Sequence, residues 1–146
     1  MTPRLALSGA AILMAAAVAL GAFGAHALKA RVGPDALAVW QTAVNYHAWH
    51  ALGLFGVGVL MLQFPQARGL RRAAWLFVAG IALFSGSLYA LALGAPATLG
   101  IVTPLGGVAF IGGWLLLAFS ARMLLDARAV GRIENRDVSR RVRRSP

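Results

Sequence analysis

Residues 5–28 read LALSGAAILMAAAVALGAFGAHAL, an almost uninterrupted apolar run. A helix of roughly 20 apolar residues crosses the hydrocarbon core of a bilayer. Runs of similar length follow at residues 44–64, 73–93 and 104–125, and 60% of the whole chain is hydrophobic while 12% is charged. The sequence therefore predicts an all-α integral membrane four-helix bundle over residues 1–125 and a basic tail over residues 126–146.

The basic residues are divided unequally between the two sides of this predicted bundle. Arg4, the loop at residues 68–72 and the segment from Arg122 onward lie on one side, whereas the other side carries only Lys29 and Arg31. The positive-inside rule then predicts that both termini are cytoplasmic. The first span also resembles a secretory signal, but it is longer than a usual signal core, so we expect it to be retained.

Small residues recur every fourth position on three of the spans. This spacing places them on one helix face, where backbones approach closely. The pattern fits packing seams inside the bundle and equally fits a dimer motif, so the oligomeric state stays open. The seams predicted in this way are Ala17, Gly21 and Ala25; Ala82, Gly86 and Ala90; and Ala109 and Gly113.

Two helix starts are visible in the sequence. Gly33 followed by Pro34 and Asp35 predicts a helix beginning at Pro34, because proline suits the first position and an acid suits the positive end of the helix dipole. A helix over residues 34–64 is roughly 45 Å long, so its first turns are expected to be interfacial, tilted or bent. Thr103 and Pro104 predict a second capped start. An aromatic belt at the interface is expected from Trp40, Tyr46 and Trp49.

The topology gathers polar side chains at the external end. His47 and His50 lie three residues apart, hence on one helix face, and His26 closes the first span. The full candidate polar cluster is His26, His47, His50, Tyr89, Ser85, Ser87, Asn45 and Thr103, with Gln41 as a further neighbour.

Three interpretations of this cluster stay open. In the first, neutral imidazoles are hydrogen-bond partners between helices. His26, His47 and His50 are alternatively the ligands of a transition-metal ion, although no cysteine or intramembrane carboxylate completes the set. The third interpretation is passage of protons or a small solute, for which the cytoplasmic halves of the spans offer no polar relay.

Five separated motifs resemble one known family. They are GAFGAHAL at 21–28, YHAWHAL at 46–52, LFSGSLYAL at 83–91, TPLGG at 103–107 and GGW at 112–114. In this order they are similar to the YgdD/YwdK-like family of small four-span membrane proteins, a domain of unknown function with bacterial inner-membrane members and a eukaryotic transmembrane relative. The resemblance implies a bacterial inner-membrane location and singles out His26, His47, His50, Tyr89, Thr103 and Pro104, but implies no activity.

Clustered arginines predict contact with anionic lipid headgroups, since a basic residue near the membrane surface contributes about 1 kcal/mol. The tail lacks the interleaved aromatic residues typical of nucleic-acid binding, so no nucleic-acid partner is expected. Its end is compatible with a weak amphipathic helix or with disorder. The arginines concerned are Arg68, Arg71, Arg72, Arg140, Arg141, Arg143 and Arg144.

Catalytic patterns are missing from the sequence. It contains no cysteine, no paired carboxylates inside the spans and no phosphate-binding glycine loop followed by lysine. We therefore expect a non-enzymatic membrane protein. Two classes remain: a structural or accessory component, with a second copy or another membrane protein as partner, and a metal-binding protein or a carrier of solute or protons that uses the histidines.

Overall fold

The computed structural model describes the backbone of residues 1–142 and the side chains of residues 1–124 and 126. Every regular element in this part of the chain is helical, which confirms the predicted all-α class. The α-helices are α1 (Pro3–His26), α2 (Pro34–Gln63), α3 (Arg68–Gly80), α4 (Gly86–Ala92) and α5 (Val102–Val142). The short elements are η1 (Leu28–Ala30), η2 (Ile81–Ser85) and η3 (Ala97–Ile101).

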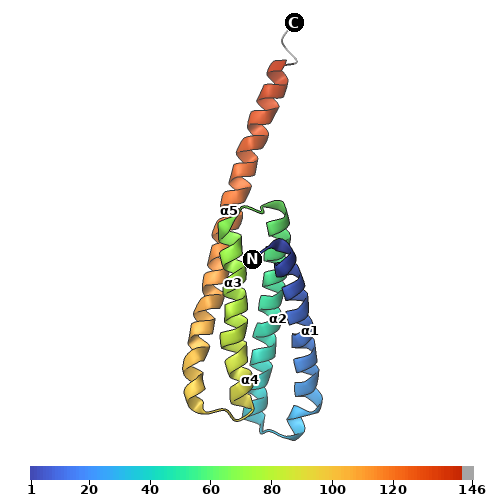
Figure 1. Ribbon diagram of the computed structural model, residues 1–146, viewed down its shortest axis with the longest axis vertical. Helices are drawn as coiled ribbons and strands as arrows, with labels where there is room; N and C mark the ends of the chain where they lie inside the picture. Colours follow the sequence, from blue (N-terminus) through green and yellow to red (C-terminus); the bar gives the residue numbers. More distant parts are fainter. Residues whose placement is uncertain (143–146) are drawn as a thin grey trace.

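These helices form four rods that lie side by side, with α3, η2 and α4 joined into one of them (Figure 1). The α2 rod packs between α1 and the α3/α4 rod, and the α3/α4 rod in turn packs against α5. The N-terminus, the turn at residues 64–67 and the point where α5 leaves the bundle share one end, here called the terminal end. The turns at residues 27–33 and 93–101 share the other, here called the loop end.

Within the described part of the chain, three stretches are long and apolar enough to cross a membrane, namely Pro3–Ala30, Arg68–Ala92 and Ala97–Leu124. Helix α2 is not among them, although its 30 residues give a length of about 45 Å. Polar residues such as Asn45, His47 and His50 lower its mean hydropathy. Because α2 is surrounded by α1 and the α3/α4 rod, the two histidines are shielded inside the bundle.

The predicted start of the second helix is confirmed. Pro34 occupies the first turn of α2 and Asp35 follows it there. At the other end of the bundle, the Thr2 hydroxyl caps α1 by accepting a hydrogen bond of 3.2 Å from the Leu5 backbone nitrogen. Helix α4 ends at Ala92 and is followed by Gly94, whose φ of 92° is the left-handed conformation that glycine adopts most easily.

The third rod contains a feature that the sequence did not predict. Between α3 and α4 the chain makes a π-helical turn, Ile81–Ser85. Its wider hydrogen-bonding pattern rotates the following residues relative to a regular helix. Ser85 and Ser87 are buried, whereas Ala82 is exposed and Gly86 and Ala90 are half-buried, so the predicted stripe of Ala82, Gly86 and Ala90 does not form a buried seam inside the bundle.

The seam of α1 is also displaced from the prediction. Its buried residues are Ala6, Ala10, Ala17 and Gly24, whereas Ala25 is exposed. The Trp40 ring covers Gly24, and Trp40 Nε1 donates a 3.0 Å hydrogen bond to the Leu20 carbonyl. Trp40 is only 3% exposed and packs between α1 and α2. It therefore does not belong to an interfacial belt.

Helix α5 continues through the predicted domain boundary at residue 125. It is 41 residues long and projects well beyond the terminal end (Figure 1). Helical structure therefore reaches Val142 without a break. Arg143 and Arg144 lie outside the described residues, as do the side chains of Arg140 and Arg141, so their contact with headgroups stays a prediction.

Candidate functional site: a polar and aromatic cluster within the bundle

His47 links α2 to α4. Its side chain is 5% exposed, and Nδ1 lies 3.3 Å from the Tyr89 hydroxyl. Tyr89 also contacts Trp40, with ring centroids 4.6 Å apart. The other ring nitrogen of His47, Nε2, is buried and has no hydrogen-bond partner among the described residues.

His50 is held by two contacts of different kinds. Its Nδ1 donates to the Tyr46 carbonyl at 2.7 Å, because a carbonyl oxygen can only accept. Its ring stacks on Phe110 of α5, with centroids 3.4 Å apart and an interplanar angle of 13°. Phe77 of α3 lies 5.8 Å away between centroids, so rings from both α3 and α5 lie beside His50.

A hydroxyl pair joins the third and fourth rods. Ser87 Oγ donates to the Phe84 carbonyl at 2.9 Å and lies 2.7 Å from the Thr103 hydroxyl. Thr103 therefore does not cap α5 as predicted. Helix α5 already begins at Val102, and the Thr103 hydroxyl contacts Ser87 of α4 instead. Ser85, by contrast, is fully buried and its hydroxyl has no partner among the described residues.

The other predicted members lie elsewhere. His26 is exposed at the end of α1. Asn45 is also exposed, and its Oδ1 accepts a 3.0 Å hydrogen bond from Gln41 Nε2. Among the described residues no three His, Cys, Asp or Glu side chains come together in a group that could hold a metal ion. The structure thus brings His47, His50, Tyr89, Ser87 and Thr103 into neighbouring interhelical contacts, but it does not assemble the three-histidine site.

Sequence reasoning missed the aromatic half of the cluster. Phe84 and Phe110 pack around Tyr46, whose ring centroid is 4.6 Å from that of Phe84. Phe77 and Trp114 pack together at 5.0 Å between centroids. The glycines that face these rings are the sequence feature that could have indicated them, since Gly80 lies beneath Phe110 and Gly113 beneath Phe77.

With this geometry defined, comparison with known proteins becomes informative. A family described as "Protein of unknown function (DUF423)" matches residues 20–107, a range that includes His26, His47, His50, Tyr89 and Thr103. The chain belongs to the DUF423 family. The matched range thus holds all three histidines, together with Tyr89 and Ser87, through which α4 contacts α2 and α5.

Relatives of this DUF423 chain are similar over most of their length. It is 50% identical to UPF0382 membrane protein YwdK of Bacillus subtilis over 105 residues, covering 72% of this chain and 85% of that protein. It is 40% identical to UPF0382 inner membrane protein YgdD of Escherichia coli over 127 residues, covering 83% of this chain and 92% of that protein. No solved structure matches. The expected family resemblance is confirmed, and the DUF423 chain is a membrane protein of a family without an assigned activity.

Proposed function

We propose that this protein is a non-enzymatic structural or accessory component of a bacterial inner membrane. One observation carries the proposal: three buried polar side chains of the bundle contact neighbouring helices. His47 meets Tyr89, His50 stacks on Phe110 and Ser87 meets Thr103. Hydrogen bonds between helices contribute about 0.6 kcal/mol each in membrane proteins, so the two bonded pairs help to set how the rods pack.

A second candidate function is passage of protons or a small polar solute. It is favoured by two buried atoms, His47 Nε2 and Ser85 Oγ, that lack partners among the described residues. Ionisable residues inside a membrane, such as His47, often mark a path for ions or protons. The π-helical turn that carries Ser85 adds support, because such turns often occur at functional sites.

Replacing His47 with alanine distinguishes the two candidates. If the histidine serves packing, His47→Ala lowers the stability of the detergent-solubilised protein by about 1–2 kcal/mol, since both the Tyr89 contact and the ring volume are lost. Thermal unfolding followed by circular dichroism measures this loss. His26→Ala is the matched control, because His26 is exposed and its removal should leave stability unchanged.

The carrier candidate makes an additional prediction for the same variant. In proteoliposomes that enclose a pH-sensitive dye, His47→Ala would abolish a proton flux shown by the native protein, whatever the change in stability. No flux above that of protein-free vesicles, together with the stability loss, supports the structural component. A flux that depends on His47 overturns it.

We further propose that the terminal end is cytoplasmic. The basic residues Arg4, Arg68, Arg71 and Arg72 all lie at or near that end, whereas the loop end carries Lys29 and Arg31. Because the chain contains no cysteine, single cysteines report topology without background labelling. In intact spheroplasts, a membrane-impermeant maleimide should label Lys29→Cys and should reach Gln66→Cys only after lysis. The reverse pattern would place the terminal end outside.

A further inference from the structure

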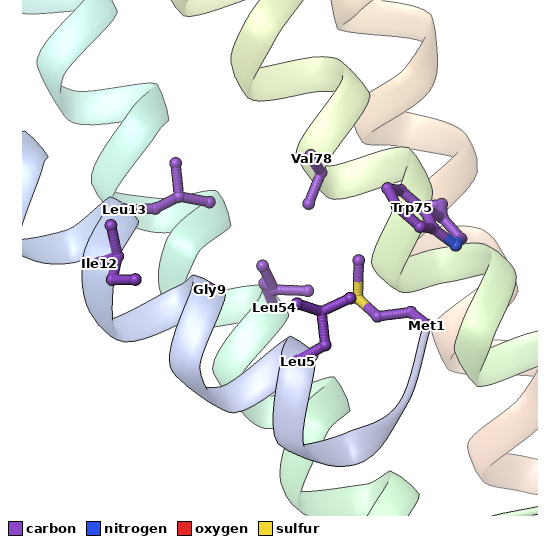
Figure 2. Close-up of a pocket in the computed structure, with 8 residues that line it drawn as sticks. All are labelled: Met1, Leu5, Gly9, Ile12, Leu13, Leu54, Trp75 and Val78. Atoms are coloured by element: carbon purple, nitrogen blue, oxygen red, sulfur yellow. The ribbon is translucent and has the colours of Figure 1, made fainter.

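An apolar groove runs along the seam between α1 and α3, with α2 as its floor. It has a volume of about 240 Å³ and is lined by eight residues, which Figure 2 shows as sticks. The groove exists because α1 packs almost entirely on α2 and makes little contact with α3. The lining residues are Met1, Leu5, Gly9, Ile12, Leu13, Leu54, Trp75 and Val78.

The shape of the groove suits a narrow apolar chain. Fully buried Leu54 forms its floor, and Leu5 and Trp75 form opposite walls near the terminal end. From Leu5 to Leu13 the groove follows α1 for about 12 Å at 1.5 Å per residue. Its volume lies below the roughly 300–1,000 Å³ typical of pockets for drug-sized molecules. A single hydrocarbon chain fits such a slot, whereas a whole helix, about 10 Å in diameter, does not.

Positive charge continues from the groove toward the terminal end. Residues 68, 71, 75 and 78 of α3 are spaced by three and four, so they form one stripe on the helix. Arg68 and Arg71 therefore lie on the same face as Trp75 and Val78, which line the groove. Arg71 is fixed in place, because its Nη2 donates to the Pro65 carbonyl at 2.8 Å and to Gln66 Oε1 at 3.4 Å. A guanidinium has five N–H donors, so others remain for a phosphate.

We propose that this groove is a binding site for an anionic phospholipid, with one acyl chain lying between α1 and α3 and the headgroup phosphate at Arg68 and Arg71. Charge complementarity selects this occupant over a second copy of the chain. The protein has a formal net charge of +10, and a second copy docked in parallel would place its own arginines against Arg68 and Arg71. An anionic headgroup instead neutralises them.

Gly9 provides a way to fill the groove without disturbing the bundle. A Cβ at Gly9 meets nothing within 4 Å, so leucine there projects into open groove space. Gly56 of α2 is a matched control, because its Cβ also meets nothing within 4 Å and it does not line the groove. Both changes replace a helical glycine by leucine and gain the same helix propensity.

The test is native mass spectrometry of the full chain in detergent, titrated with phosphatidylglycerol or phosphatidylcholine of identical acyl chains. We expect one tightly held phosphatidylglycerol per protein, with affinity reduced about tenfold by Gly9→Leu and unchanged by Gly56→Leu. Replacing both arginines by glutamine should weaken phosphatidylglycerol binding roughly thirtyfold, about fivefold for each charge. It should weaken phosphatidylcholine binding less, because the choline group of that lipid offsets the charge of its phosphate.

Several results would overturn the proposal. Equal affinity for the two lipids would show that the site does not select a headgroup with net negative charge. Equal behaviour of Gly9→Leu and Gly56→Leu would show that the lipid binds outside the groove. A dimer that is lost in Gly9→Leu alone would assign the groove to a second copy. Circular dichroism must first show that each variant keeps the native helix content.

Discussion

Replacing Gly106 with alanine is expected to destabilise the bundle by about 2–3 kcal/mol, the range for forcing an extra methyl group into a packed interior. The added Cβ would overlap the Phe84 backbone nitrogen and lie 2.7 Å from Phe84 Cβ and 2.8 Å from its Cα. Backbone atoms cannot swing aside as a flexible side chain does. Helix α5 and the π-helical turn would therefore have to separate.

The neighbouring glycine supplies the control for this prediction. A Cβ at Gly107 lies 3.8 Å from the nearest atom of the Phe84 ring, which is an ordinary contact. Gly107→Ala should thus leave stability unchanged or raise it by up to about 1 kcal/mol through helix propensity. Denaturant titration of both variants in the same detergent measures the difference, and equal losses would show that α5 does not approach the third rod this closely.

Truncating Phe110 to alanine is expected to remove about 3 kcal/mol of stability, at the lower end of the range for buried phenylalanines. Its ring is 3% exposed and stacks on His50 while also contacting Tyr46 and Phe84. The same substitution at Phe119, which is 63% exposed on α5, should have little effect. Thermal unfolding followed by circular dichroism distinguishes them.

A double variant makes the Phe110 prediction sharper. A Cβ at Gly80 would overlap the Phe110 ring, so Gly80→Ala alone should be destabilising. Once Phe110 is alanine, the obstruction is gone and Gly80→Ala should be tolerated. The two changes are therefore expected to be strongly non-additive, as is usual for residues in direct contact. Simple additivity would mean that Gly80 and Phe110 do not pack together.

The sequence predicted the helices better than it predicted their contacts. Apolar length and the Gly33–Pro34–Asp35 signal located α1, α2 and the shared ends of the rods correctly. The π-helical turn at Ile81–Ser85 was missed because a single wider turn leaves no trace in composition or hydropathy. A regular four-residue spacing does not hold across this wider turn, and the stripe of Ala82, Gly86 and Ala90 is therefore not a buried seam.

The polar cluster was predicted in part for a similar reason. The structure brings His47 and Tyr89 together, as their positions in the loop-end half of neighbouring rods predict, whereas His50 lies near the middle of α2 and contacts other rings. His26 was added on depth along the helix axis, but depth does not specify rotation, and the structure leaves this residue exposed. Phe110 was not considered because one apolar residue among many carries no distinguishing pattern, although it is the closest ring to His50.

The unbroken course of α5 has a mechanical consequence. Residues 126–142 extend the helix by roughly 25 Å past the predicted boundary of the membrane domain. If α5 tilted by about 10° within the bundle, the far end of that extension would move by about 4 Å. The stacking of Phe110 on His50 holds α5 against the bundle. It therefore also sets the direction in which the basic extension of α5 points.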